Sequence, residues 1–220
     1  MTNDSSIPDG VLIIEDFLDS DTAAELKHFT EGEIGIINKE DVKTEDGTLR
    51  VTRSKGLVSE RIYTRKISAT ATAICDRVFG EVIPQHYGVN IEWYEFPHII
   101  RYRAGGRYVP HADADARKNE QSDWFRNVDR DFSAIIYFND SYEGGTLYFP
   151  NHDFRIKPEP GMLVCFPSDH RYIHTAEPVL SGVRYAFVTW AAAIGTPRVL
   201  DKPGGDVVYL NRIRTDPDNA

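Results

Sequence analysis

The sequence predicts an α+β fold that is mainly β, in which a jelly-roll-like pair of antiparallel sheets is buttressed by two N-terminal helices. Apolar residues recur at helical spacing in the first 80 positions. Beyond residue 90, short runs rich in Ile, Val, Tyr and Phe alternate with turn residues, which is typical of antiparallel strands. Helices that precede such a run of strands typically pack against one face of the sheets that they form.

The N-terminal part is expected to hold one strand and one helix. Residues 11–14, Val-Leu-Ile-Ile, have the composition of a strand. Asp19 or Asp21 can cap the exposed amides of a helix that follows, and we expect this helix to end near Thr30. Its apolar side includes Leu26.

A second helix is predicted from four apolar residues at helical spacing. Ile67, Ala71, Ile74 and Val78 form one stripe, and Gly80 is expected to end the helix. Between the two helices, residues 31–60 are charged and have few periodic apolar positions, which predicts a long loop with one hairpin around Glu45-Asp46-Gly47.

The C-terminal half is divided into strands by turn signals such as Ala104-Gly105-Gly106 and Glu143-Gly144-Gly145. The predicted strands lie near residues 91–95, 98–104, 107–111, 132–139, 146–149, 154–157, 161–166, 173–179 and 183–193. We therefore expect residues 1–8 to be a flexible N-terminus, residues 9–195 to be a single domain, and residues 196–220 to be a C-terminal extension with no assigned fold.

Composition limits the classes of function. The net charge of −9 disfavours a nucleic-acid partner, because no basic stripe with interleaved aromatics offsets it. No apolar run is long enough to span a bilayer, and the first residues lack the features of a secretory signal, so a cytoplasmic location is expected. Cys75 and Cys165 fall in a predicted helix and a predicted strand, which favours buried free thiols over a disulfide.

Three residues form a candidate metal site. His111 and Asp113 stand two positions apart at the end of a predicted strand, so their side chains point to the same face. This pair alone is a weak signal, because a surface His beside a solvated Asp gives the same pattern. With His174 on a later strand, the set offers two imidazoles and one carboxylate and leaves three positions of an octahedron open, which suits Fe(II) and oxygen. A structural zinc site would require a fourth ligand, usually a thiolate.

Arg184 is a candidate for binding a carboxylate. It follows His174 by ten positions, and a turn at Ser181-Gly182 would bring it back beside the metal strand as a hairpin. A guanidinium at this place can bind a carboxylate through two hydrogen bonds. The alternative, an exposed strand arginine, is weakened by the apolar residues that follow it.

Residues 102–113, Tyr-Arg-Ala-Gly-Gly-Arg-Tyr-Val-Pro-His-Ala-Asp, resemble the Tyr-x-x-Gly-Gly-x-Tyr-x-Pro-His-x-Asp segment of the prolyl 4-hydroxylase-like group of 2-oxoglutarate and iron(II)-dependent oxygenases. The resemblance covers residues 9–195. Upstream, residues 52–56 are more loosely similar to the Arg/Ser segment that precedes the long helix in these enzymes. Further matches follow in the family's order: Tyr137-Phe138-Asn139, Glu143-Gly144-Gly145-Thr146-Leu147, Lys157-Pro158 with Gly161, and His174 with Pro178-Val179, Gly182, Arg184 and Trp190.

This resemblance implies a double-stranded β-helix (jelly-roll) core and a role for each matched residue. It makes His111, Asp113 and His174 the iron ligands, and Arg184 the partner of the distal carboxylate of 2-oxoglutarate. It implies Fe(II) as the metal and 2-oxoglutarate and O₂ as co-substrates, with ascorbate as a further candidate. The residues expected to line the 2-oxoglutarate pocket are Tyr102, Tyr137 and Leu147, and those expected on the substrate side are Tyr108, Trp124 and Trp190, although these last three also suit an ordinary core.

The implied reaction is hydroxylation of an unactivated C–H bond. The expected substrate is a prolyl residue in a peptide or protein, and the alternative is a small molecule such as a free amino acid or a natural-product intermediate. Arg184 departs from the Lys that collagen-type prolyl 4-hydroxylases usually carry, which bears on prolyl specificity. Asp113 favours hydroxylation, because related halogenases have Ala or Gly at that position.

Two further hypotheses concern the whole domain and one of its loops. A jelly-roll module that binds a metal without turnover is the weaker alternative function, and either a monomer or a homodimer is expected. Residues 114–130 follow the metal ligands directly and are expected to form a lid that includes Trp124, the alternative being an inert solvated loop.

Overall fold

Three helices lie in the N-terminal half of the computed structural model, which describes residues 6–43, 49–53, 56–119 and 121–210. They are α1 (Ser20–Gly32), α2 (Ser68–Arg77) and α3 (Ile83–Tyr87). Of the two predicted caps of α1, Asp19 takes the role, because its carboxylate accepts the amide N–H of Thr22 at 2.7 Å.

The predicted end of the second helix at Gly80 is wrong. The chain continues from α2 through a π-type turn (Val78–Val82) directly into α3. The helical run ends at Gly88, which adopts a left-handed φ of 69° and donates its N–H to the carbonyl oxygen of Pro84 at 3.1 Å. A glycine inside a helix costs only about 1 kcal/mol relative to alanine, so packing of the run against the sheet outweighs the signal at Gly80.

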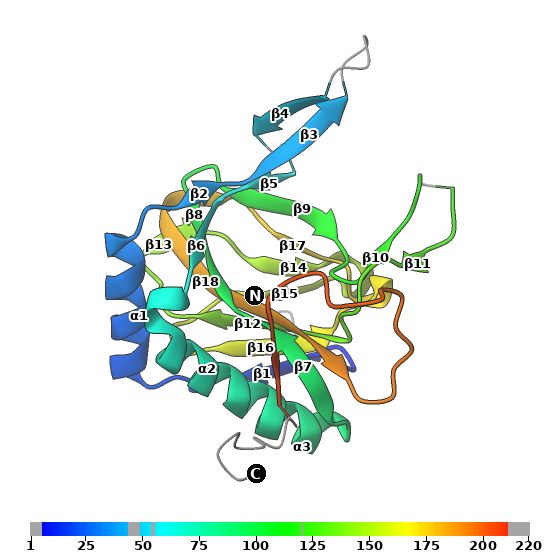
Figure 1. The fold of residues 1–220 in the computed structure, drawn as a ribbon. Coiled ribbons are helices and arrows are strands. Elements are labelled where there is room, and N and C mark those ends of the chain that lie inside the picture. The colour runs from blue at the N-terminus through cyan, green and yellow to red at the C-terminus, as the bar shows by residue number, and fades with distance from the viewer. Residues whose placement is uncertain (1–5, 44–48, 54–55, 120, 211–220) are drawn as a thin grey trace, which may run out of the picture.

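Two antiparallel sheets make up most of the described β part, and Figure 1 shows how they are arranged. The large sheet runs in the order β1 (Leu12–Ile14), β16 (Leu163–Pro167), β12 (Phe132–Tyr137), β18 (Val179–Ala193), β8 (His98–Arg103), β6 (Glu60–Tyr63) and β2 (Ile36–Ile37). Three more strands join it by pairing with β18 or with each other: β7 (Ile91–Glu95), β13 (Tyr142–Gly144) and β19 (Val207–Tyr209).

The small sheet carries the predicted metal strands. It runs in the order β15 (Phe154–Ile156), β14 (Leu147–Phe149), β17 (His174–Ala176), β9 (Arg107–His111) and β5 (Leu57–Val58). Two separate hairpins complete the described strands: β3 (Lys39–Lys43) with β4 (Leu49–Arg53), and β10 (Asp115–Ala116) with β11 (Phe125–Arg126).

The large sheet is the middle of three layers. Alternate residues of β12 point to opposite faces: Ile136 joins the hydrophobic cluster that contains the helices, and Ile135 joins the cluster shared with the small sheet. The same alternation in β18 sends Phe187 toward the helices and Ala186 toward the small sheet. Arg184 has the parity of Ala186, so its side chain lies between the two sheets.

Three expectations about the strands are revised. β2, β5 and β6, which were expected to be loop, extend both sheets. β3 and β4 pair as a hairpin, and the predicted turn at Glu45-Asp46-Gly47 lies outside the described residues. Ser181-Gly182 is not a turn, because β13 and β8 pair with β18 around it and keep the chain extended. The extension after residue 195 forms β19, which pairs with β7.

Candidate active site

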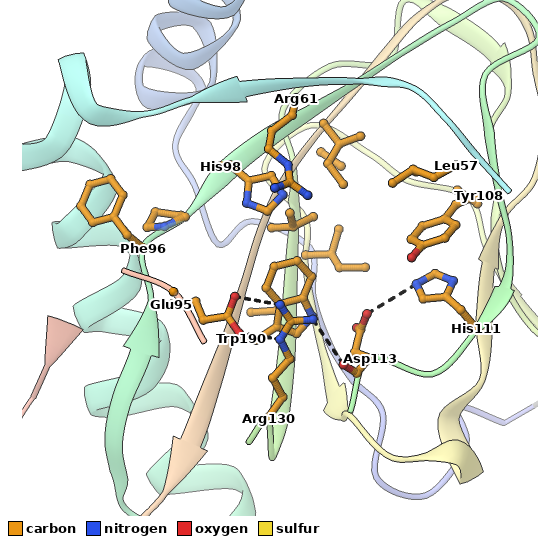
Figure 2. A pocket seen from close by; sticks show the side chains of 18 of the residues that line it. Leu57, Arg61, Glu95, Phe96, His98, Tyr108, His111, Asp113, Arg130 and Trp190 are labelled. Carbon is orange, nitrogen blue, oxygen red and sulfur yellow. Dashed lines mark hydrogen bonds and ion pairs between the residues drawn. The ribbon is translucent and has the colours of Figure 1, made fainter. Parts of the chain in front are cut away.

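The three predicted metal-binding residues meet at the edge of the cavity between the sheets. His111 on β9 and His174 on β17 are direct partners in the antiparallel register. The centres of their rings are 4.3 Å apart. Asp113 follows β9 by two residues, and its backbone N–H donates to the carbonyl oxygen of Ser168 at 3.1 Å. The metal-ligating atoms of the three side chains all lie within 4.8 Å of one another. Figure 2 shows Asp113 and His111 facing each other across this end of the cavity.

Both histidines present the same nitrogen to this cluster. Nδ1 of His111 is 2.9 Å from the carbonyl oxygen of Val109, and Nδ1 of His174 is 3.1 Å from the carbonyl oxygen of Tyr172. A neutral imidazole that donates its Nδ1–H to a carbonyl keeps Nε2 free as a metal ligand. The two Nε2 atoms face the Asp113 carboxylate at 3.4 and 3.6 Å.

The electrostatic environment favours the metal-binding protonation states. Burial lowers the pKa of His174 to about 4, with a further contribution from the neighbouring His111, so the ring is neutral near pH 7. Burial alone would raise the pKa of Asp113, but the two histidines and Arg130 outweigh it and hold that pKa well below its ordinary value. The donor set therefore offers the neutral imidazole of His174 and the ionised carboxylate of Asp113 beside the imidazole of His111, and two imidazoles with one carboxylate fit a ferrous ion.

A polar chain fixes the orientation of Asp113. The buried hydroxyl of Ser133 donates to Oδ2 of Asp113 at 2.7 Å and lies 2.8 Å from the hydroxyl of Ser168. Nη1 of Arg130 donates to the backbone carbonyl oxygen of Asp113 at 3.2 Å. Groups of this kind, which orient a ligand without touching the metal, typically affect metal affinity by 10- to 100-fold.

Arg184 reaches the same cavity from the opposite sheet and not from a hairpin beside His174. Its side chain is 2% exposed, and none of the described residues forms an ion pair with it. Nη2 donates to the hydroxyl of Tyr137 at 3.1 Å, whereas Nε and Nη1 are buried with no hydrogen-bond partner among the described residues. Burial alone would lower the pKa of Arg184, but the surrounding tyrosines raise it. The guanidinium is therefore charged and can bind an anion in the cavity.

The residues around Arg184 leave room for such an anion. The guanidinium carbon lies 4.8 Å from the ring centre of Tyr102 and 4.9 Å from that of Tyr137. Of the three residues expected here, Tyr102 and Leu147 line the cavity; Tyr137 does not line it, but its hydroxyl accepts the hydrogen bond from Arg184. Gly145, with φ of 63°, is required here because a Cβ at this position would lie 2.8 Å from Cδ of Arg184. Gly145 thus makes room for the arginine, whereas a Cβ on its neighbour Gly144 would meet the carbonyl oxygen of Pro178.

The other end of the cavity, which measures about 440 Å³ in all, is polar and aromatic. Arg130 forms an ion pair with Glu95 at 2.5 Å, and its guanidinium carbon lies 3.8 Å from the ring centre of Trp190. Arg61 and His98 lie beyond them. Nε of Arg61 and Nε2 of His98 are both buried, and neither has a hydrogen-bond partner among the described residues. Figure 2 shows these two side chains next to each other, above Trp190. This end therefore offers unsatisfied nitrogen atoms to a bound molecule.

The three expected substrate-side aromatics have different positions. Tyr108 and Trp190 line the cavity, and the Tyr108 ring stacks on His111 with 3.5 Å between ring centres. Trp124 does not line it: its ring stacks on His170 at 5.3 Å with a 6° angle between the planes. The described residues of the segment, 115–119 and 121–126, likewise contribute no side chain to the cavity.

Several residues of the site were missed in the sequence. Arg61 and Glu95 lie on strands that are remote from the metal motif in sequence, and no local pattern links them to it. Ser133 is different, because a single hydroxyl in the apolar run Phe-Ser-Ala-Ile-Ile-Tyr is a recognisable signal of a buried polar contact. His98 begins a predicted strand and carried no signal of its own.

Comparison with known proteins places this geometry in a family context. Residues 97–192 match the family described as 2OG-Fe(II) oxygenase superfamily. The chain is 30% identical over 128 residues to a PKHD-type hydroxylase from Pseudomonas putida, covering 56% of this chain and 54% of the relative. It is 26% identical over 201 residues to prolyl 4-hydroxylase 1 from Arabidopsis thaliana, covering 82% and 68% of the two chains.

The fold is shared with solved structures. The 2OG complex of a viral collagen prolyl hydroxylase from Paramecium Bursaria Chlorella virus-1 superimposes with a TM-score of 0.58 at 17% identity, covering 83% of this chain and 96% of the other. This likeness confirms the predicted jelly-roll architecture. The chain spans about half the length of the first curated relatives that it matches. Among the described helices, none combines the length and the apolar character that crossing a membrane requires.

Proposed function

We propose that this protein is a 2-oxoglutarate- and Fe(II)-dependent dioxygenase that hydroxylates an unactivated C–H bond, in line with the match of residues 97–192 to the 2OG-Fe(II) oxygenase superfamily. The observation that supports this most strongly is the convergence of His111, Asp113 and His174 opposite the unpaired, buried Arg184. A structural metal site would not need a buried cation beside it. A site that binds an anionic co-substrate next to the metal does.

The proposed roles follow from the contacts of each side chain. His111, Asp113 and His174 hold Fe(II), and Arg184 binds the distal carboxylate of 2-oxoglutarate with the nitrogen atoms that have no hydrogen-bond partner among the described residues. When bound, the ferrous ion supplies the redox chemistry by which 2-oxoglutarate and O₂ become succinate and CO₂ and one oxygen atom enters the substrate C–H bond. Tyr102 and Leu147 orient the oxo acid and exclude water from it.

We propose a prolyl residue in a peptide or protein as the substrate. The named relatives and the superimposed structure include prolyl hydroxylases. Arg61 and His98 support a substrate with hydrogen-bond acceptors, such as peptide carbonyl groups, because both present a buried nitrogen without a partner in the described part of the chain. Burial lowers the pKa of His98 to about 3, so near pH 7 this ring takes part as a neutral hydrogen-bonding group.

One observation favours a free amino acid or another small carboxylic acid as the alternative substrate. The guanidinium of Arg61 forms no ion pair with any described residue, and a carboxylate would neutralise it. Succinate release separates the two substrates: we expect 2-oxoglutarate turnover to be stimulated by a peptide with a central proline and not by free amino acids. Stimulation by free amino acids alone would replace the peptide with the alternative.

The oxygenase assignment has its own test, which does not require the substrate. Anaerobic addition of Fe(II) and then 2-oxoglutarate should produce the weak visible charge-transfer band of the chelate, and the band should be absent in Arg184→Met at the same 2-oxoglutarate concentration. The matched control is the same substitution at an exposed arginine, Arg103→Met, which should keep the band. Arg103 lies on β8, pairs with Glu60 and has a side chain that is 59% exposed. If the parent protein gives no band, a metal-binding module without turnover is the better description.

A further inference from the structure

The C-terminal strap, residues 198–210, forms part of the wall of the cavity although it lies outside the segment that matches the family. At its beginning, Nη2 of Arg198 donates to Oε2 of Glu92 at 2.6 Å and to the carbonyl oxygen of Ala193 at 2.8 Å. The buried carboxylate of Asp129, 3% exposed, accepts the amide N–H groups of Val199 and Leu200 at 2.8 and 3.1 Å. A buried carboxylate that serves two strap amides fixes this end firmly.

The other end of the strap is fixed by the large sheet. β19 pairs with β7 in antiparallel register, and the red segment of Figure 1 runs beside that strand. The amide of Phe96 donates to the carbonyl oxygen of Asp206 at 2.7 Å. The carboxylate of Asp206 forms an ion pair with Arg65, whose guanidinium carbon lies 4.0 Å from the ring centre of Phe96.

Between its two fixed ends, the strap presents Gly204, Gly205 and Asp206 to the cavity. The neighbouring rim residues are Arg65 and Phe96, which line the same cavity. The strap therefore borders the outer end of the cavity, on the side of the unsatisfied Arg61 and His98, and not the end that holds Arg184.

Neither glycine is required by the backbone. Both have φ outside the left-handed range, a Cβ on Gly205 would meet nothing within 4 Å, and one on Gly204 would lie 3.7 Å from Cδ1 of Leu200. A side chain could therefore be accommodated by the fold at both positions. What a side chain would change is the space at the rim of the cavity.

We propose that this glycine pair determines specificity: it keeps the outer rim open so that a peptide chain can continue past the hydroxylated residue and over the strap. This inference rests on the proposed oxygenase function and specifies its substrate as an extended peptide. Residues 204–205 are exposed, so their backbone groups are accessible to such a chain. A substrate that ends at the hydroxylated residue would not reach them.

The test adds side chains of increasing size in Gly205→Ala and Gly205→Leu. The probes are a decapeptide with a central proline and N-acetylprolinamide, and the readout is succinate release. We expect Gly205→Leu to raise KM for the decapeptide about tenfold, as an overfilled contact typically does, with a smaller effect of Gly205→Ala. KM for N-acetylprolinamide and for 2-oxoglutarate should not change. Gly80→Leu, at an exposed helical glycine with open space around its Cβ, is the matched control.

The result that would overturn the proposal is an equal effect on both probes, or none on either. Hydrogen exchange supplies a readout that does not depend on turnover: the decapeptide should slow exchange of the amides of residues 204–206 in the parent protein, and Gly205→Leu should abolish this protection. Absence of protection in the parent overturns the proposal even if neither probe is converted. If the parent protein shows neither the charge-transfer band nor uncoupled succinate release, the oxygenase function itself has failed. This outcome differs from failure of the proposal on the glycine pair.

Discussion

The two ends of the cavity are built in different ways. At the inner end, Arg184 is a single buried cation held among tyrosines, with no acidic partner among the described residues. At the outer end, Arg130 is already paired with Glu95, and Arg61 and His98 each retain one nitrogen without a partner. The inner end is therefore suited to one small dianion of fixed shape. The outer end offers several weaker contacts, which suits a larger and more variable molecule.

This difference has an energetic basis. A fully buried charge without a counterion is costly, and it is retained only where a ligand of opposite charge compensates it. At the outer end, Glu95 already compensates the charge of Arg130, the His98 ring is neutral near pH 7, and the Arg61 side chain is partly exposed, so these groups cost less free energy in the absence of a ligand. Substitutions at the inner end should therefore affect co-substrate binding strongly and specifically, whereas substitutions at the outer end should have moderate effects on the substrate alone.

The largest expected effect comes from the metal cluster, on which both ends depend. His174→Ala removes one of the three proposed ligands and should reduce iron content and succinate release by at least about 100-fold, beyond the 10- to 100-fold effect of groups that only orient a ligand. Iron analysis and a turnover assay measure this. His86→Ala, at an exposed histidine on α3, should match the parent protein. Full iron retention in His174→Ala would exclude His174 as a ligand.

The inner end is tested by Arg184→Met. We expect KM for 2-oxoglutarate to rise roughly 10- to 100-fold, which corresponds to the ~1.5–3 kcal/mol of a charged hydrogen bond. The stability of the metal-free protein should not fall, because an unpaired buried charge is removed. Thermal unfolding and co-substrate titration measure the two effects. A variant that loses stability while keeping its affinity for 2-oxoglutarate would show that Arg184 is structural.

The outer end is tested by Arg61→Met. This change removes the unpaired guanidinium and should raise KM for the peptide substrate roughly tenfold, the effect of about 1.4 kcal/mol, because one charge-assisted hydrogen bond is lost. KM for 2-oxoglutarate and uncoupled succinate release should stay at parent values. Equal changes in both KM values would mean that the two ends do not act separately.

The smallest expected effect concerns the predicted lid. Trp124→Ala should change kcat/KM by less than about twofold, because the Trp124 ring stacks on His170 and does not line the cavity. The lost stacking should cost roughly 0.5–1.5 kcal/mol of unfolding free energy. Peptide turnover and chemical denaturation measure both. A decrease of kcat/KM well beyond twofold would support the hypothesis that residues 114–130 form a lid.

How much of the site could be predicted depended on how close its parts lie in sequence. His111 and Asp113 were identified because two positions along a strand fix a shared face, and the spacing is visible in the sequence. Arg184 was identified as a candidate as well, but the prediction of its position in the fold was wrong. It lies on β18 of the opposite sheet and not on a hairpin beside His174. The turn composition of residues 181–182 was outweighed by pairing on both sides of β18.

The strap was not predicted at all. Residues 196–220 contain several Pro and Gly and show no period, which is typical of an unstructured extension. The pairing of β19 with β7 depends on an available edge of the large sheet, and the fixing of Arg198 depends on Glu92, more than 100 residues away in the chain. Such partners are brought together only by the folded sheet.

The sequence by itself indicated the chemistry proposed for this protein: the identity and order of the candidate metal-binding residues, the arginine that faces them and the alternating pattern that turns them inward. Strand periodicity places His111 and Asp113 on one face, because alternate residues on a strand have fixed relative directions. The resemblance of residues 102–113 to a known segment implied the remaining assignments. Only the tertiary structure decided which residues face these groups across the cavity, and so the shape of its outer end. Arg61, His98 and the strap reach that end through long-range pairing, whose register depends on the packing of both sheets together.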